Sequence, residues 1–323
     1  MTILLEFKEK LRAVYGKYGT YILPVLKFAL AFCVFSSLNN SLGFTAKLNN
    51  IFVILILSLI CAITPLNTIV IFGAVLIVGH CFSLGIEVAA IALILFLVIE
   101  ILYLRFMQGD SLALVLTPFA YSLGIPCAVP VGFGLLRGPV SSLSVACGVI
   151  IQYFLELLKT KAPLLQAADE KAMLNNVKVI LEGIVNNRQM LIAMLACITV
   201  VLVVNTIRKL SVDYSWHIAV ATGSVTYAAI MILGGMVIDE QGNVIQLVLG
   251  VLGGALISLI LEFFVYNVDY SRSESFQYED DEYYYYVKAI PKISITKSKR
   301  EVKKIQRENV SPFPREEEEN NEL

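Results

Sequence analysis

The chain has 323 residues, of which 57% are hydrophobic and only 16% are charged, and its formal net charge is −1. Soluble domains are typically about half apolar and about a quarter charged, so this composition excludes an ordinary soluble domain and indicates a protein dissolved in a lipid bilayer. The charged residues gather after position 269, which separates an apolar region, 19–268, from a polar tail, 269–323.

The N-terminal stretch, residues 1–18, is basic and amphipathic and carries Lys8, Lys10, Arg12 and Lys17. It lacks a separate apolar core followed by a small-residue cleavage site, so we expect no removable signal peptide. The first apolar span would then act as the targeting signal.

Apolar stretches of membrane-spanning length follow one another through the apolar region. A helix needs about 20 apolar residues, within a range of about 17 to 25, to cross the hydrocarbon core. Seven stretches qualify and an eighth is short but continuous; in chain order they are 21–38, 50–63 (the short one), 66–82, 87–104, 140–158, 190–207, 215–237 and 244–266. Because backbone groups in lipid must be satisfied within a segment, we predict an all-α integral membrane protein, a bundle of about eight transmembrane helices.

Segment 112–138 is unusually rich in proline and glycine. Proline removes a backbone donor and glycine loosens a helix, so we predict short helical pieces here. Two interpretations stay open: a re-entrant hairpin that lines a transport pathway, or two kinked helices packed in the bundle. In the first interpretation, the residues that shape the pathway are Pro126, Pro130, Gly132, Gly134 and Gly138.

Basic residues near the ends of spans predict the orientation, because they favour the cytoplasm. Arg105, Arg137 and the pair at 208–209 share a face with the N-terminus and the tail if segment 112–136 enters and leaves on one side. We therefore predict that both termini are cytoplasmic.

Residues 160–189 are too polar to span, yet they carry apolar residues at helical spacing. This pattern predicts an amphipathic helix that lies along the membrane surface or caps the bundle.

Gly250 and Gly254 form a GxxxG pair, which allows another helix to approach closely. That helix belongs either to the same chain or to a second copy, so a homo-oligomer through this pair is one expectation. His80 lies near the end of its span, and we interpret it as a hydrogen-bonded structural residue rather than a proton relay.

The tail, 269–323, carries the sequence EDDEYYYYVK at 279–288. Its four acids and four tyrosines are Glu279, Asp280, Asp281, Glu282, Tyr283, Tyr284, Tyr285 and Tyr286. They form either a docking strand for a cytoplasmic protein or a spacer whose tyrosines rest on lipid headgroups. Residues 283–296 have strand-like chemistry, and we expect disorder in 311–323.

At VDYSW, 212–216, and again across 263–293, the chain resembles a family of uncharacterised bacterial polytopic membrane proteins, some of which carry the label permease. The similarity runs from about Tyr15 to Ile293 and includes GIPCAVPVGFGLLRGP. The resemblance implies a location in the bacterial cytoplasmic membrane. It brings no activity, ligand or catalytic residue with it.

The sequence has no GxxxxGK[ST] loop, no HExxH and no GxSxG, and its six cysteines lie in apolar stretches without paired spacing. We therefore expect no enzyme, cofactor, metal site or nucleic-acid partner. The leading functional prediction is a transporter or permease-like component in the bilayer, motivated by the broken segment. The alternative is a membrane scaffold that recruits a cytoplasmic protein through its acidic, tyrosine-rich tail.

Overall fold

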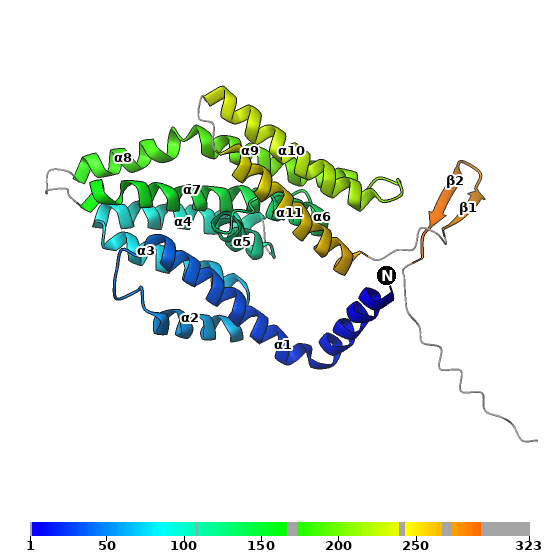
Figure 1. Cartoon of the computed structure of the whole chain (residues 1–323), viewed down its shortest axis with the longest axis horizontal. Helices are drawn as coiled ribbons and strands as arrows, with labels where there is room; N and C mark the ends of the chain where they lie inside the picture. The colour runs from blue at the N-terminus through cyan, green and yellow to red at the C-terminus, as the bar shows by residue number, and fades with distance from the viewer. Residues whose placement is uncertain (1, 107–108, 167–172, 239–242, 267–272, 292–323) are drawn as a thin grey trace, which may run out of the picture. The chain divides into compact units, whose positions relative to one another are not determined.

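The computed structural model describes residues 2–106, 109–166, 173–238, 243–266 and 273–291. This part of the chain is mainly helical, in agreement with the predicted all-α class (Figure 1). In chain order the elements are α1 (Thr2–Leu42), α2 (Ile51–Ile63), α3 (Asn67–Phe82), α4 (Ile86–Phe106), α5 (Ser111–Ser122), α6 (Ala128–Leu136), α7 (Ser141–Gln166), α8 (Met173–Val185), α9 (Arg188–Ile207), α10 (Ser215–Ile238), α11 (Val244–Val265), β1 (Glu274–Glu279) and β2 (Tyr284–Ala289).

Five stretches among the described residues are long and apolar enough to cross a membrane: Glu6–Leu42, Ser141–Leu165, Asn176–Ile207, Ser215–Ile238 and Val244–Val265. Helices α2, α3 and α5 are apolar but have only 13, 16 and 12 residues. At about 1.5 Å per residue each is shorter than the hydrocarbon core, which is about 30 Å thick. The chain is thus compatible with a multi-pass membrane protein, while eight crossings stay a prediction.

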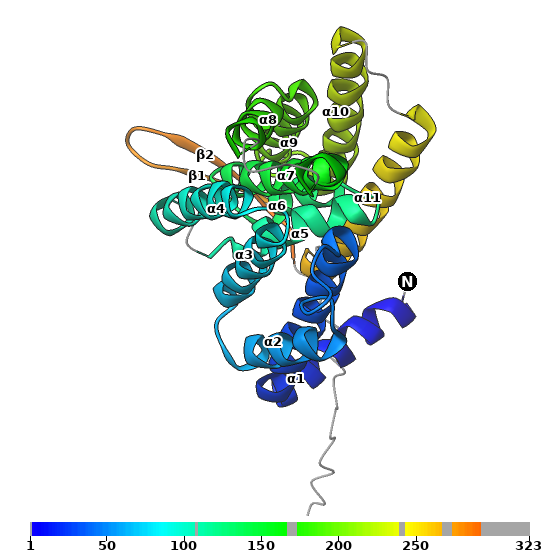
Figure 2. The same cartoon turned by 90° about the vertical axis from the view of Figure 1, so that its left-hand side faces the viewer.

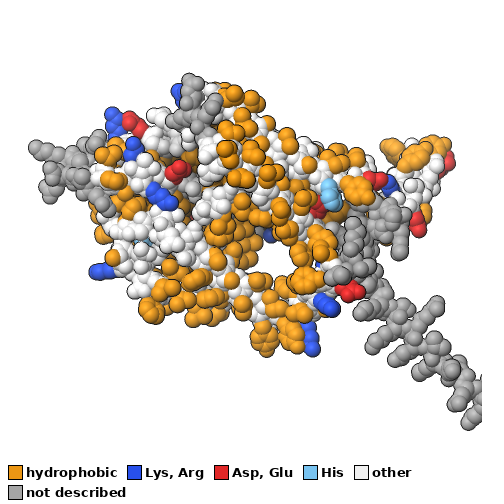
Figure 3. All heavy atoms as spheres, viewed as in Figure 1, with side chains coloured by type: hydrophobic (Ala, Val, Ile, Leu, Met, Phe, Trp, Pro, Cys, Tyr) orange, Lys and Arg blue, Asp and Glu red, His pale blue; other side chains and the backbone are white. Residues whose placement is uncertain are grey.

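The surface of the bundle is apolar where a soluble protein would be polar. Large side chains such as Ile63 and Val237 are 84% and 82% exposed. Figure 3 shows hydrophobic side chains over much of the visible face, with most of the charged side chains toward its two ends. Exposed apolar area of this extent is unfavourable in water and matches lipid instead.

The buried side chains form two hydrophobic clusters that meet at α7. One cluster is built mainly from α1 to α4, and the other mainly from α5, α6, α9 and α10. Phe154 of α7 belongs to the first cluster, and Val149 and Tyr153 of the same helix belong to the second. The two short helices α5 and α6 lie among the longer ones in both views (Figures 1 and 2).

The region of the predicted surface helix, 160–189, is divided among three helices. The first positions extend α7 as far as Gln166, α8 forms a separate helix, and α9 begins at Arg188. Ile180 of α8 is fully buried, and Asn176 donates a hydrogen bond to Glu87 of α4 at 2.9 Å. The apolar spacing predicts helix here, and the structure has helix in three separate elements, of which α8 packs against α4 and α7.

Tail residues 274–289 form an antiparallel β-hairpin in which Tyr278 pairs with Tyr285 and Phe276 pairs with Val287. The strand chemistry predicted for 283–296 thus corresponds to β2 for its first part. Residues 292–296 and the predicted disordered end, 311–323, lie outside the described residues.

Candidate functional site

The proline- and glycine-rich segment folds as α5, a turn at 123–127, and α6. Gly124 takes a positive φ of 75°, a conformation that glycine adopts without strain. The turn is closed by the Ile125 amide, which donates to the Ala120 carbonyl at 2.9 Å. With 12 and 9 residues, α5 and α6 are about 18 Å and about 14 Å long. Neither reaches across a bilayer alone.

The two ends of this segment meet. Arg137, directly after α6, forms an ion pair with Asp110, directly before α5, with Nε and Oδ1 3.4 Å apart. The Arg137 guanidinium also donates to the Gly109 carbonyl at 3.3 Å. Burial raises the pKa of the Asp110 carboxyl, and the charge of Arg137 partly offsets that rise.

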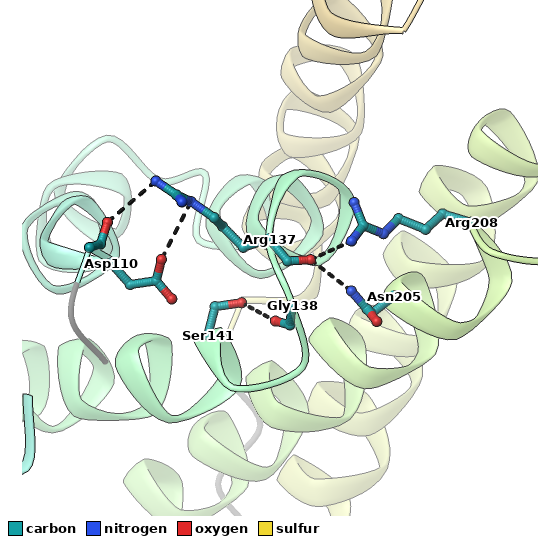
Figure 4. A network of polar contacts seen from close by, with 7 residues as sticks. Asp110, Arg137, Gly138, Ser141, Asn205 and Arg208 are labelled. Atoms are coloured by element: carbon teal, nitrogen blue, oxygen red, sulfur yellow. Dashed lines mark hydrogen bonds and ion pairs between the residues drawn. The ribbon is translucent and has the colours of Figure 1, made fainter. Parts of the chain in front are cut away.

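The C-terminal end of α6 is held by two side chains from the end of α9 (Figure 4). Asn205 donates its amide to the Arg137 carbonyl at 2.7 Å, and Arg208 donates to the same carbonyl at 2.5 Å and to that of Leu135. The last carbonyls of a helix have no partner within it, and a cation there also interacts favourably with the helix dipole. Asp110, Arg137, Asn205 and Arg208, which we call the base network, therefore fix both ends of the α5–α6 hairpin.

The turn of the hairpin packs against α11. A Cβ on Gly250 would lie 2.4 Å from the Gly124 carbonyl oxygen, and one on Gly254 would lie 2.8 Å from the Ala128 amide nitrogen. The two glycines thus contact the same chain, one of the two options that the GxxxG pattern left open. A homo-oligomer through this pair stays a prediction.

Two clefts lie beside the α5–α6 hairpin. The first, about 450 Å³, lies among α1, α3, α5 and α7 and includes Glu156 and Lys159. The second, about 390 Å³, lies among the turn and α7, α9, α10 and α11, and its lining includes Tyr121, Tyr153 and Tyr227. We call it the tyrosine cleft. Tyr121 lines both clefts, so the end of α5 stands between them.

The five residues predicted to shape a pathway have different surroundings. Pro126 lines the tyrosine cleft, whereas Pro130 is buried in the first turn of α6. A Cβ on Gly134 would lie 2.8 Å from Val204 Cβ, and one on Gly132 would lie 3.3 Å from Leu261, so both glycines allow close helix packing. Gly138 has no atom within 4 Å of such a Cβ.

The eight predicted docking residues of the tail surround the turn of the β-hairpin. Glu279 ends β1, and Tyr284 to Tyr286 lie in β2. The Asp280 carboxylate accepts hydrogen bonds from the amides of Glu282 and Tyr283 and from the Tyr285 hydroxyl at 2.9, 2.7 and 2.8 Å. These bonds lower the pKa of Asp280. The four tyrosines are 43% to 78% exposed.

His80 is fully buried, and its Nε2 lies 2.8 Å from the Asn39 amide oxygen. Its Nδ1 accepts the Thr45 amide at 3.3 Å. Both ring nitrogens are occupied, which fits the structural role favoured for this residue. A second histidine, His217, pairs with the buried Glu262 at 2.7 Å.

Sequence reasoning missed Asn205 and the three tyrosines of the cleft. The tyrosines lie at positions 121, 153 and 227, too far apart to form a motif. In the sequence, Arg208 indicates only the topology. Its position at the end of a span, three residues after Asn205, is the one local sign of its contact with α6.

No protein-family model, curated protein or solved structure matches this chain. The family resemblance at 212–216 and 263–293 therefore stays a prediction.

Proposed function

We propose that the chain is a transporter or permease-like membrane component in which α5 and α6 form a re-entrant hairpin that enters from the cytoplasmic side. The contact between Asp110 and Arg137 carries the proposal, because a segment whose two ends touch returns to the face that it left. The lengths of α5 and α6 support the same reading, since a full crossing needs about 20 residues.

The face of the membrane from which the hairpin enters follows from the distribution of basic residues. Arg105, Arg137 and Arg208 lie at or near the base of the hairpin, and basic residues near span ends favour the cytoplasm. The tyrosine cleft borders the opposite end, where the turn lies, and the first cleft runs along α5 from Leu114 to Ser122. In this conformation the hairpin would close the protein toward the cytoplasm while the clefts open toward the outside, one half of an alternating-access cycle.

Single cysteines in a cysteine-free chain test this arrangement. Phe106→Cys and Gly138→Cys mark the two flanks, and Leu123→Cys marks the turn; the replaced side chains are exposed. A membrane-impermeant maleimide should label both flanks only in inside-out vesicles, and the turn only from outside. Flanks that react from opposite faces would overturn the proposal, because the segment would then be a single crossing.

The β-hairpin supports the scaffold as a second candidate. Phe276, Tyr278, Tyr285 and Val287 share one face of the two strands and are all exposed, at 41% to 53%. Exposed aromatic side chains of this kind are typical of protein interfaces. A photocrosslinker at position 285 of the full chain should capture one cytoplasmic protein, and Val287→Ser should abolish the adduct. Lipid adducts alone would favour the headgroup spacer instead.

A further inference from the structure

Helix α11 turns one buried face toward the rest of the bundle. Its buried residues lie four positions apart and therefore share this face; they are Gly250, Gly254, Ser258 and Glu262. The two glycines contact the hairpin turn, and Leu261, next to the glutamate, packs closely against α6. Glu262 thus lies on the face of α11 that packs against the hairpin.

Glu262 is a buried acid with little compensation. Only 3% of the residue is exposed, and neither carboxylate oxygen makes a hydrogen bond of good geometry with a described residue. Its Oε1 lies 2.7 Å from Nδ1 of His217 on α10. A carboxylate in an apolar interior is costly unless a cation pairs with it. The carboxyl group is therefore either paired with a protonated histidine or protonated itself.

The other cations at this end of the bundle are engaged elsewhere. Lys8 of α1 donates to a backbone carbonyl next to Glu262, and Arg208 donates to the carbonyls at the end of α6. Arg137 is held by its ion pair with the residue before α5, and α6 itself carries no ionisable side chain. Among the described residues, His217 is thus the one ionisable group in ion-pair contact with Glu262.

His217 connects this buried acid to water. The histidine side chain is 63% exposed, whereas that of Glu262 is 4% exposed. Its ring meets that of Tyr214 edge to face, with the centroids 5.8 Å apart. The guanidinium of Arg208 lies 5.9 Å from the ring centroid of the neighbouring Trp216, so the pair is at the same end of the bundle as the base network. In the proposed orientation, a proton reaches the acid from the cytoplasmic side.

We propose that Glu262 and His217 form a proton-binding site that couples the hairpin to the proton gradient across the membrane. This rests on the proposed function and deepens it, because it names the coupling ion. One proton taken up by the ion pair from the cytoplasmic side leaves a neutral carboxyl group beside an imidazolium. The attraction between α10 and α11 is then lost at the end where α11 packs against α6, and release of the proton restores it.

A lipid-soluble carbodiimide tests the site, because it reacts with carboxyl groups that carry a proton within the membrane. The full-length protein in lipid vesicles is treated with dicyclohexylcarbodiimide, and the adducts are located by mass spectrometry of its peptides. Glu262 should be modified, with a yield that falls as the pH rises from about 6 to about 9. Glu100 of α4, a half-buried acid, is the internal reference.

Two substitutions of His217 give opposite expectations. His217→Arg places a permanent cation beside the carboxyl group and keeps it ionised, so the ratio of the adduct at Glu262 to that at Glu100 should fall about tenfold. His217→Gln removes the cation, which favours the protonated acid, and the ratio should rise. If neither variant changes the ratio, or if Glu262 is never modified, the proton site is wrong.

Coupling to the hairpin has a measurement of its own. Gly138→Cys is labelled by a maleimide in inside-out vesicles at two pH values, and each rate is divided by that of a free thiol in solution. Lowering the pH should raise the corrected rate. Glu262→Gln, which cannot ionise, should give the higher rate at both pH values. A pH dependence that survives in Glu262→Gln would assign it to another group, such as Asp110, and would overturn the coupling.

These results separate the proton site from the proposed function. If Phe106→Cys and Gly138→Cys are both labelled from the cytoplasmic side while the His217 variants leave the adduct ratio unchanged, the hairpin stands and the proton site falls. If the ratio responds but the two flanks react from opposite faces, the proposed function falls and the coupling falls with it, whereas Glu262 still binds the proton.

Discussion

Tyr227 places a hydroxyl in the interior near the hydroxyl of Tyr121, but neither hydroxyl makes a hydrogen bond of good geometry with a described residue. Such a group costs stability, about 1–3 kcal/mol relative to a satisfied one. We therefore predict that Tyr227→Phe leaves the protein as stable as before or stabilises it by about 1 kcal/mol, measured by unfolding in detergent. A loss of stability on this substitution would mean that the hydroxyl is bonded within the chain.

Asn205 supplies the opposite case, because its amide donates to the Arg137 carbonyl at 2.7 Å and is buried. Asn205→Leu should destabilise the protein by about 1–3 kcal/mol, since it leaves the carbonyl groups at the end of α6 with one donor fewer. The free energies of unfolding of Asn205→Leu and Tyr227→Phe are measured side by side. Because both variants replace a buried polar group with an apolar one, a general response of the bundle to such a change would lower both values.

The glycines of the packed regions differ in how much space an added Cβ atom would have. A Cβ on Gly250 would meet the Gly124 carbonyl oxygen at 2.4 Å, whereas one on Gly138 would meet nothing within 4 Å. We predict that Gly250→Ala lowers the unfolding free energy by about 1–3 kcal/mol, the usual range for overpacking. Gly138→Ala should change it little. Similar thermal midpoints for the two variants would contradict the close contact between α11 and the hairpin turn.

At the scale of elements, Arg208 joins α9 to the end of α6 with two nitrogens on two carbonyls. A lysine ammonium is a point charge and cannot reproduce this planar, two-pronged contact. We predict that Arg208→Lys loses about 1.5–3 kcal/mol, the usual value for hydrogen bonds to a charged group. Cysteine at Gly138 should also label faster from the cytoplasmic side in this variant. Unchanged labelling would separate Arg208 from the base of the hairpin.

The tail hairpin has a pH dependence whose sign follows from Asp280. Hydrogen bonds from two amides and the Tyr285 hydroxyl lower the pKa of its carboxyl below the ordinary 3.8. A lowered pKa gives stabilisation that is present above the ordinary value and is lost as the pH falls through the lowered one. We predict that amide exchange at 282–283, corrected for the intrinsic rate, is slowed at pH 6 and loses this protection only as the pH falls below 3.8 through the lowered pKa. Asp280→Asn keeps an acceptor but does not titrate, so its protection should not change over this range.

The sequence predicted elements where the cause is local and missed those where it is not. Proline and glycine interrupt a helix at their own positions, so short helices within 112–138 were predictable. The five long apolar helices were also predictable, because composition alone reveals them, while the count of eight crossings stays a prediction. The tyrosine cleft was not, since Tyr121, Tyr153 and Tyr227 are brought together only by the packing of α5, α7 and α10. The hydrogen bond between Asn176 of α8 and Glu87 of α4 likewise joins positions 89 residues apart, so no local pattern predicts it.

At the scale of the whole molecule, α2 and α3 form a second pair of short helices whose two outer ends lie close together, as those of α5 and α6 do. The Leu48 carbonyl, before α2, accepts a hydrogen bond from Asn39 of α1 at 2.8 Å, and His80, near the end of α3, contacts the same asparagine. The turn between α2 and α3 lies elsewhere on α1, where Lys27 donates to the Thr64 carbonyl at 3.0 Å. Lys27 and Asn39 are separated by 12 positions, or about 18 Å along a helix.

Together these contacts favour six full crossings, by α1, α4, α7, the α8–α9 pair, α10 and α11, with one short hairpin entering from each face. Six crossings, like eight, would leave both termini on one side, as the distribution of basic residues predicts. Eight crossings, the count expected from apolar stretches alone, would need α2 and α3 to reach the cytoplasm.

Labelling of Thr64→Cys distinguishes six crossings from eight. Lys27 donates to the backbone carbonyl of Thr64, so the substitution should preserve that bond. With six crossings the turn ends inside the bilayer, and a membrane-impermeant maleimide applied to inside-out vesicles should leave this cysteine unlabelled. Gly138→Cys in the same vesicles should react, and the Thr64→Cys chain should label after denaturation, which shows that the thiol is intact. Labelling of Thr64→Cys at the rate of Gly138→Cys would place the turn at the cytoplasmic surface. α2 and α3 would then be full crossings, and the count of six would be wrong.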